Sequence, residues 1–304
     1  MRTVVIHRAD NINGPWEGRV ALQDKGVAQG GLIDTPDGRW FAYLFRDNGS
    51  VGRIPYLVPV KWEDGWPVLG INGKVPETLD LPASKGLIPG IVASDEFTRK
   101  KKDAALPLVW QWNHNPVNEA WSLTERPGFL RLKTNRVVDN LFLAPNTISQ
   151  RMEGPECSGV VALDVAHMKE GDVAGFSAFN GDAALLSVIV RNGKKYLTMS
   201  VDSVSLDSSN KAVLDVKSEE KEQLELNQSV VYLRIDGNFR LNHDIASCYY
   251  SLDNKNWKKI GEDFKMKFDY RRLFIGTRFA IFNYATNSLG GYVDVDYFDY
   301  KKTE

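Results

Sequence analysis

Residues 183–201 read AALLSVIVRNGKKYLTMSV, and this stretch decides the class of fold. Two runs rich in aliphatic and β-branched residues, 183–191 and 195–201, lie on either side of the dipeptide Asn192-Gly193. Asn-Gly suits the two positions of a type I′ turn that need positive φ, so the runs predict an antiparallel β-hairpin.

Further runs with β-branched or aromatic density follow the same pattern in the second part of the chain. They are residues 128–134, 158–165, 229–236, 245–252, 273–283 and 291–300. The best helical candidate is 218–226, but polar residues cover nearly every face of it, which favours a loop or an exposed edge. Roughly 200 residues of successive strands without helices predict a two-sheet jelly-roll sandwich.

The first 80 residues have paired strands and a higher density of tryptophan. Residues 30–45 contain two strand-like runs around the turn sequence TPDG, and residues 56–71 contain two around EDG. Pro, Asp and Gly are favoured in turns, so each pair predicts an antiparallel unit. Residues 40–45 are apolar on both alternating faces, and we expect this strand to lie between neighbouring sheets, as in stacked blades.

The pattern predicts three parts, which suits a chain of 304 residues. Paired strands occupy residues 1–82, a Pro-punctuated linker occupies 83–105, and the sandwich occupies 106–304. The basic run Arg99-Lys100-Lys101-Lys102 in the linker indicates a solvated face.

Composition excludes several classes of partner. The 38 basic and 39 acidic side chains give a net charge of -1, which disfavours nucleic acid as a partner. Hydrophobic residues make up 43% and charged residues 25%, as in globular domains, and no apolar run approaches the length of a membrane span. No export signal is visible at the first residues.

The cysteines and histidines give no sign of a metal or redox site. Cys157 and Cys248 are the only cysteines, and we expect two buried thiols rather than one isolated disulfide. The four histidines are far apart and are expected to be structural or on the surface: His7, His114, His167 and His243. The chain has no GxSxG, P-loop, HExxH or strand-borne GxGxxG motif.

One cluster of carboxylates could in principle form an acid/base pair. It consists of Asp34, Asp37, Glu63 and Asp64. All four are at predicted turns, where Asp bonds to nearby backbone, and we favour that role.

Two stretches of the first part resemble the last blade of the five-bladed propeller of glycoside hydrolase family 43. They are QGGLIDTPDGRW at 29–40 and VGRIPYLVPVKWEDGWPV at 51–68. The later stretches are similar to the concanavalin-like sandwich at the C-terminus of β-xylosidases: WQWNHNP at 110–116, WSLTERPGFLRL at 121–132, YSLD at 250–253 with Trp257, and GGYVDVDYF at 290–298. The resemblance therefore implies an all-β chain, a partial five-bladed β-propeller segment followed by a concanavalin-like jelly-roll β-sandwich.

The resemblance also implies an activity, the exo-acting removal of xylose or arabinose from xylan-type plant polysaccharide with inversion. Inversion needs a general acid and a general base, which the family supplies from the first blades of the propeller. No residue of this sequence matches them. A propeller needs at least four blades, and about 80 residues make roughly one and a half. We expect missing N-terminal blades as a partner, and no turnover by this chain alone.

Two substrate-binding residues follow from the resemblance. Arg53 matches the family arginine that reaches the floor of the active site, where it binds sugar hydroxyls and keeps the base ionised. The alternative role for Arg53 is a structural ion pair with carboxylates of the neighbouring turns. Gln29 is at the position of a histidine near the propeller axis, close to a water-coordinated calcium. No cofactor or metal motif is visible in the sequence. Because Gln29 replaces the family histidine, the sequence does not decide whether a structural calcium is bound.

Three functions remain open at this point. The chain is part of a family-43 glycosidase acting on xylo- or arabino-oligosaccharides, a non-catalytic carbohydrate-binding module, or a structural β-sandwich. Binding of xylan without hydrolysis would favour the second.

Overall fold

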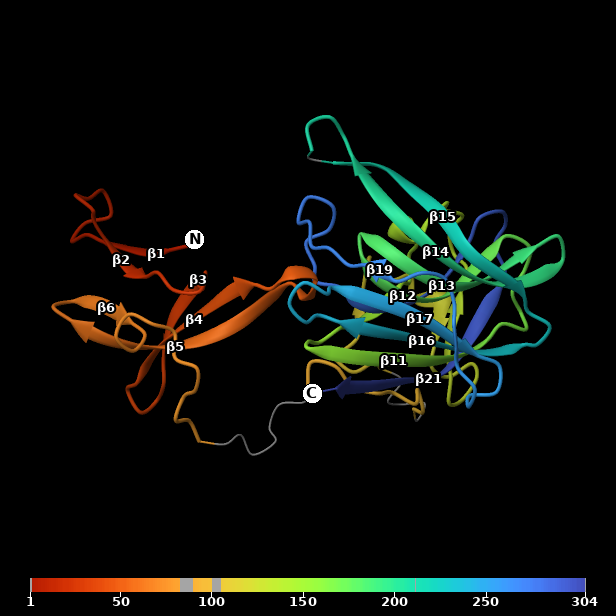
Figure 1. Cartoon of the computed structure of the whole chain (residues 1–304), viewed down its shortest axis with the longest axis horizontal. Helices are drawn as coiled ribbons and strands as arrows, with labels where there is room; N and C mark the ends of the chain where they lie inside the picture. Colours follow the sequence, from red (N-terminus) through yellow and green to blue (C-terminus); the bar gives the residue numbers. More distant parts are fainter. Residues whose placement is uncertain (1, 83–89, 100–104, 211, 304) are drawn as a thin grey trace. The chain divides into compact units, whose positions relative to one another are not determined.

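The computed structural model describes residues 2–82, 90–99, 105–210 and 212–303. In these residues the regular structure is β-strand with short 3-10 turns, as the all-β prediction required (Figure 1). The chain divides into two compact units. Unit 1 comprises Met1–Asn48 and Gly52–Ile88, and unit 2 comprises Gly49–Val51 and Pro89–Glu304. In the described ranges, no helical segment is long and apolar enough to cross a membrane.

Unit 1 contains a two-stranded hairpin and a four-stranded antiparallel sheet. The hairpin joins β1 (Val4–Arg8) to β2 (Glu17–Leu22). The sheet has the order β3-β4-β5-β6, with β3 (Ala28–Asp34), β4 (Trp40–Asp47), β5 (Arg53–Glu63) and β6 (Trp66–Leu69). Both predicted strand pairs are present, and Asp64 and Gly65 make the β5–β6 turn with φ of 50° and 71°.

The prediction for residues 40–45 holds on one face of β4 and fails in part on the other. Ala42 and Leu44 are buried in the core of unit 1, which also contains Val58 and Val60 of the adjacent strand. On the opposite face Tyr43 is 53% exposed. Unit 1 therefore covers β4 at Ala42 and Leu44, and on the opposite face at Phe41 but not at Tyr43.

Unit 2 is a sandwich of two antiparallel sheets. The seven-stranded sheet has the order β15-β14-β13-β12-β20-β10-β7. The eight-stranded sheet has the order β18-β17-β16-β11-β21-β9-β8, with β19 paired to β17. The bounds are β7 (Gln111–Trp112), β8 (Trp121–Ser122), β9 (Leu130–Lys133), β10 (Ile148–Arg151), β11 (Glu156–Asp164), β12 (Asp172–Asn180), β13 (Asp182–Arg191), β14 (Lys194–Leu206), β15 (Val213–Glu225), β16 (Val230–Asn238), β17 (Ile245–Ser251), β18 (Lys258–Lys259), β19 (Phe264–Lys265), β20 (Arg278–Ala285) and β21 (Tyr292–Thr303). Short 3-10 turns occur at Gly49–Val51, Asn118–Ala120 and Leu141–Leu143.

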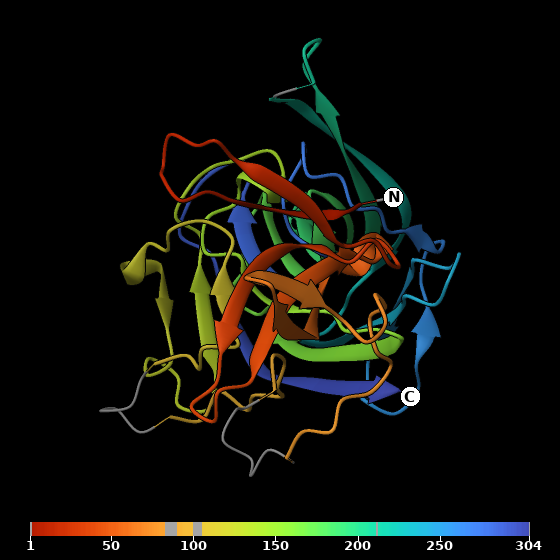
Figure 2. The ribbon, with the colours of Figure 1, turned by 90° about the vertical axis from the view of Figure 1, so that its left-hand side faces the viewer.

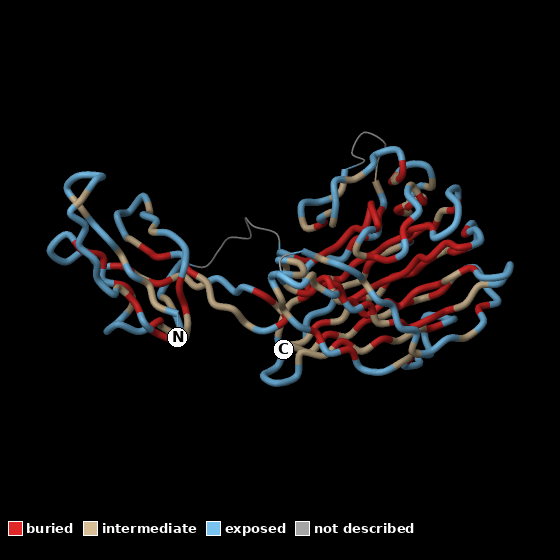
Figure 3. The backbone as a smooth tube through the Cα atoms, turned by 90° about the horizontal axis from the view of Figure 1, so that it is seen from above, coloured by how far each residue is buried: buried red, intermediate tan, exposed pale blue. Residues whose placement is uncertain are grey.

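Three phenylalanines connect the two sheets across the core. Phe176 of β12 and Phe279 of β20 are stacked with ring centroids 5.5 Å apart. Phe298 of β21 packs against both rings, at 6.1 and 5.8 Å. Figure 3 shows the resulting continuous runs of buried residues along the strands of unit 2.

The β13–β14 hairpin is confirmed, with Asn192 and Gly193 at φ of 53° and 72° as a type I′ turn requires. Residues 218–226, for which the sequence favoured a loop or an exposed edge, belong almost entirely to the edge strand β15. Its outward Glu and Lys side chains discourage pairing with another sheet edge. The ends of β14 and β15 extend beyond the rest of unit 2 in two views (Figure 1, Figure 2).

Residues 90–99, which the sequence assigned to a linker, contribute to the sandwich. Val92 and Phe97 are buried in its core, and the backbone of Asp95 pairs with that of Phe298. The Asp95 carboxylate accepts hydrogen bonds from Trp110 Nε1 at 2.9 Å and from Arg99 at 2.6 Å. The rest of the basic run, Lys100 to Lys102, lies outside the described residues.

The central strand β12 was not predicted, because its sequence DVAGFSAFN contains small residues in place of β-branched ones. Small residues are needed here: a Cβ on Gly175 would lie 2.2 Å from the carbonyl oxygen of Leu186 on β13. Close approach of the neighbouring backbone therefore selects glycine at this position.

We predict that Gly175→Ala lowers the free energy of unfolding by about 2–3 kcal/mol, because the added methyl group forces the backbones of β12 and β13 apart. Gly193→Ala is the matched control. A Cβ there meets open space, so only the positive φ opposes it, at about 1 kcal/mol. Urea unfolding followed by circular dichroism measures both, and equal losses would contradict the packing argument.

Candidate functional site

Gln29 is at a bulge in the first strand of the unit 1 sheet. The register of β3 against β4 shifts between Ala28 and Gly30, and Gln29 has a φ of 57°. At the next position, a Cβ on Gly30 would lie 1.9 Å from the carbonyl oxygen of Tyr43. The bulge therefore turns the Gln29 side chain out of the regular ladder.

Gln29 also lines a pocket of about 480 Å³ in unit 1. The other walls come from β1, β3, β4 and β6 and are mainly apolar. Thr3 is the second residue with a polar side chain among those that line it. The pocket thus joins an apolar wall to an amide that both donates and accepts hydrogen bonds.

Arg53 begins β5, directly opposite Asp47 in the β4–β5 ladder. Its Nε donates to Asp47 Oδ1 at 3.3 Å, and its guanidinium lies 4.1 Å from the centre of the Phe45 ring. Asp47 also forms an ion pair with Arg2. Arg53 is not among the residues that line the Gln29 pocket, so that pocket does not unite the two predicted site residues.

The predicted turn carboxylates behave as turn residues where their contacts are described. Asp37 accepts hydrogen bonds from the Thr35 hydroxyl and from Arg39, within the β3–β4 turn. Those hydrogen bonds, the one from Thr35 first, lower the pKa of Asp37 below its usual value. Asp37 is therefore held ionised, which suits a turn and does not suit a general acid.

Both cysteines are free and buried, as predicted. Burial raises the pKa of Cys157 and of Cys248 to about 12, so both thiols are neutral near pH 7. Among the described histidines, His167 stacks on Tyr292 with ring centroids 4.5 Å apart, and His114 Nε2 lies 2.8 Å from the Phe142 carbonyl oxygen. In the part of the chain that the structure describes, no group of three His, Cys, Asp or Glu side chains is placed to hold a metal ion.

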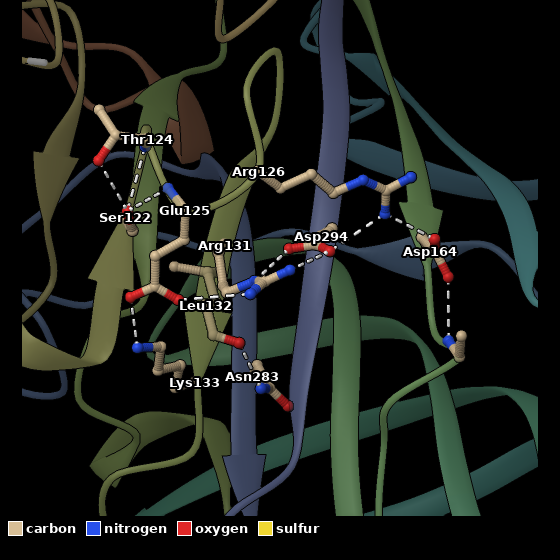
Figure 4. A network of polar contacts seen from close by, with 11 residues as sticks. Ser122, Thr124, Glu125, Arg126, Arg131, Leu132, Lys133, Asp164, Asn283 and Asp294 are labelled. Atoms are coloured by element: carbon tan, nitrogen blue, oxygen red, sulfur yellow. Dashed lines mark hydrogen bonds and ion pairs between the residues drawn. The ribbon is translucent and has the colours of Figure 1, made fainter. Parts of the chain in front are cut away.

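An arginine network ties an edge of the eight-stranded sheet to its middle (Figure 4). Arg131 of β9 donates to both carboxylate oxygens of Asp294 on β21, at 2.8 and 2.9 Å. Arg126 reaches the same carboxylate at 3.1 Å and Asp164 of β11 at 2.7 Å. Asp294 is 2% exposed, so its charge depends on these two guanidinium groups.

Charge in this network is balanced, which favours a structural role. The anions are Glu125, Asp164 and Asp294, and the cations are Arg126, Arg131 and Lys133. Burial of Asp294 raises the pKa of its carboxyl, but the hydrogen bonds from Arg131 and Arg126 outweigh burial, and the net pKa lies below the usual value.

The comparisons with known proteins agree with the fold of both units. Residues 94–301 match the family described as "Beta xylosidase C-terminal Concanavalin A-like domain". A β-xylosidase of Formosa agariphila is 31% identical over 98% of this chain and 53% of its own length. A putative β-xylosidase of Xylanibacter ruminicola is 29% identical over 87% of this chain and 48% of its own. The chain spans about half the length of these curated relatives.

Solved structures extend the similarity to the whole chain. A protein of Bacteroides eggerthii described as a bifunctional GH43-CE is 55% identical, with a TM-score of 0.89, over 100% of this chain and 38% of that one. A GH43 glycoside hydrolase engineered to display both endo-xylanase and exo-arabinofuranosidase activity is 30% identical, with a TM-score of 0.83, over 98% of this chain and 60% of that one. The predicted fold class, a propeller segment followed by a concanavalin-like sandwich, is confirmed.

We predict that Asp294→Asn lowers the free energy of unfolding by about 2–3 kcal/mol near pH 7, because both arginines lose their shared carboxylate. The native pKa of Asp294 is lowered. Its charge therefore stabilises the fold above the unfolded pKa of about 4, and this contribution is lost as the pH falls through the native pKa.

Urea unfolding between about pH 6 and pH 3 checks this linkage, and the gap between wild type and Asp294→Asn should narrow as the pH falls. Asp215→Asn, on the exposed edge strand β15, is the control and should follow the wild type. A gap of constant size across this range would contradict the assigned charge.

Proposed function

We propose that this chain, which belongs to the glycoside hydrolase family 43 group with a β-xylosidase C-terminal concanavalin A-like domain, takes part in hydrolysing glycosidic bonds of xylo- or arabino-saccharides. The observation that carries the proposal is the 55% identity to the Bacteroides eggerthii GH43-CE protein over 100% of this chain, because it includes unit 1 as well as the sandwich. A sandwich alone would support only a binding or structural role.

The chemistry that we propose is inverting hydrolysis, in which a carboxylic acid protonates the leaving oxygen and a carboxylate about 6.5–9.5 Å away activates water. We place both groups in propeller blades that this chain does not contain. Support comes from the carboxylates of unit 1 with described contacts: Asp37 is bonded within its turn, and Asp47 is paired with arginines. Neither is poised to give up or accept a proton at a sugar.

Within unit 1 we propose Arg53 as a residue that binds substrate and keeps the general base ionised. Stacking on Phe45 and the bond to Asp47 restrict the guanidinium to a narrow range of orientations. A planar, permanently charged fork held in this way binds vicinal sugar hydroxyls with little loss of rotamer entropy.

We propose Gln29 as a second substrate-binding residue, on different grounds. Its positive φ is unfavourable for a residue other than glycine, by about 1–2 kcal/mol, and such strain concentrates at functional sites. The pocket beside it has room for a sugar ring or a water cluster.

We predict that the purified chain releases no 4-nitrophenol from 4-nitrophenyl β-D-xyloside or α-L-arabinofuranoside, since acid/base catalysis contributes about 10²–10⁴-fold for each group. Addition of a polypeptide with the remaining blades of the relatives should restore hydrolysis. The control is a preparation free of host glycosidase. If the chain alone hydrolyses either substrate there, and Arg53→Ala abolishes that activity, the proposal that the catalytic carboxylates lie in other blades is refuted.

In that restored assembly, we predict that Arg53→Ala lowers kcat/KM by about 10²-fold or more, because a charged donor near the reacting sugar is lost. Arg53→Lys keeps the charge but loses the fork and should recover only part of the rate. The matched control is Arg39→Ala, which removes an ion pair with Asp37 in the β3–β4 turn of the same unit. Similar effects of Arg53→Ala and Arg39→Ala would assign Arg53 to structure.

A further inference from the structure

A polar groove runs across the outer face of the eight-stranded sheet in unit 2. Its volume is about 520 Å³, and we call it the Arg234 groove. Residues from β11, β16 and β21 and from the segment between β17 and β18 line it, including Arg234, Asn254, Trp257, Tyr297, Asp299 and Lys301. These strands are neighbours in the sheet order, and Figure 1 shows β21, β11, β16 and β17 side by side.

The register of four strands places the polar groups in one row. Asp299 of β21 is opposite Val160 of β11, which is opposite Arg234 of β16, which is opposite Tyr249 of β17. Phe298, next to Asp299, points into the core, so alternation along the strand puts Asp299 on the outer face. The groove therefore crosses β21, β11 and β16 and also extends along β21, where Tyr297, Asp299 and Lys301 line it.

Arg234 is held in place by two aromatic rings and one carboxylate. Its guanidinium lies 4.3 Å from the Tyr249 ring centre and 5.1 Å from that of Trp257, and it pairs with Asp236 at 3.1 Å. Its Nε is buried and has no hydrogen-bond partner among the described residues. The Arg234 side chain is 27% exposed, so a ligand in the groove meets the exposed part of this side chain and not its buried Nε.

Trp257 follows a tight turn at residues 253–256, of which Asn254 also lines the groove. The Asp253 carboxylate accepts hydrogen bonds from the backbone of Asn256 and Lys255, at 2.8 and 2.9 Å, and from the Ser251 hydroxyl at 3.0 Å. These bonds, those from Asn256 first, hold the pKa of Asp253 well below its usual range. The indole is thus preorganised beside Arg234, which reduces the entropy that a ligand must overcome.

Charge in the groove narrows the class of ligand. Glu96 and Asp299 balance Arg234 and Lys301. A strongly anionic ligand would meet two carboxylates, and an apolar one would leave charged groups without water or partners. A neutral ligand with many hydroxyl groups satisfies donors and acceptors alike, and the apolar C–H face of its ring packs on an aromatic ring.

The available length suits more than one sugar unit. A second groove of about 530 Å³ adjoins the first and shares Ser158 and Arg234 with it. It continues over Asp236, Asn238 and Ser247, which supply further donors and acceptors. Arg234 is therefore at the junction of two polar grooves on one face.

We propose that the Arg234 groove binds a neutral oligosaccharide, with one pyranose ring against Trp257 and hydroxyl groups bonded to Arg234 and Asp299. The assignment of a xylan-type oligosaccharide rests on the function proposed above. The assignment of a neutral ligand with many hydroxyl groups rests on the groove alone. The groove would keep polysaccharide on the sandwich without any change to it.

The test is isothermal titration of the whole chain with xylohexaose, and separately with cellohexaose. Wild type should bind, and Trp257→Ala should weaken binding about tenfold or more, through loss of the stacked ring. Trp257→Phe keeps an aromatic face and should recover part of the affinity. Asp299→Asn removes a partly exposed charge and its 3.6 Å ion pair with Lys301, and it should weaken binding severalfold. Because an exposed ion pair contributes only about 0–1 kcal/mol, the thermal unfolding midpoint should change little.

Tyr270→Ala is the control, since Tyr270 is an aromatic residue of unit 2 that is 65% exposed and does not line either groove. Equal affinity of wild type, Trp257→Ala and Asp299→Asn would overturn the proposal, as would no binding of either sugar at millimolar concentration. Binding of cellohexaose alone, lost in Trp257→Ala, would uphold the groove and speak against xylan as the ligand. Glycosidase activity plays no part in this readout, so the groove and the catalytic proposal fail separately.

Discussion

The sandwich depends on how closely its central strand β12 approaches its neighbours. Gly175 lets the backbone of β13 come within a distance that any side chain would prevent, and one residue later Phe176 fills the space between the sheets. Phe279 and Phe298 complete the contact from the two sheets. Because side chains alternate along a strand, fixing Phe298 inward also fixes which side chains of β21 point outward, and the paired registers of β11 and β16 extend this order to Arg234. The outer face is a consequence of the core.

Local sequence predicted those parts of the fold in which turn chemistry and side-chain density agree. The Asn192-Gly193 turn and the strand pairs of unit 1 are examples, since Asp, Asn and Gly accept the positive φ that these turns need. Strand β12 was not predicted because the close approach of β13 requires a small residue at Gly175. That requirement exists only in the folded sheet and leaves no strand-like pattern in the local sequence. Phe97 was missed for a related reason: it fills a core made by strands far away in sequence.

The candidate sites show the same division. Family resemblance indicated Arg53 and Gln29, and the structure adds that one is stacked on Phe45 and that the other is at a strained bulge. No local pattern could have predicted the Arg234 groove. Asp299, Val160 and Arg234 are far apart in the chain and meet only through the pairing of β21 with β11 and of β11 with β16. The resemblance included Trp257 together with YSLD, but the position of Trp257 beside Arg234 depends on the fold.

Two arginines of the eight-stranded sheet show how a structural charge differs from one available for binding. Arg131 bonds to Asp294 through two nitrogens and to Glu125 through the third. A ligand at Arg131 would have to break bonds that hold β9 to β21. Arg234 is equally well oriented, by two rings and by Asp236, yet its side chain is 27% exposed where it lines both grooves, and its ion pair among the described residues is with a single carboxylate. A hydroxyl oxygen can therefore bond to the exposed part of the Arg234 side chain without breaking the contacts that orient it. That difference, rather than charge or exposure alone, is why binding is assigned to Arg234 and structure to Arg131.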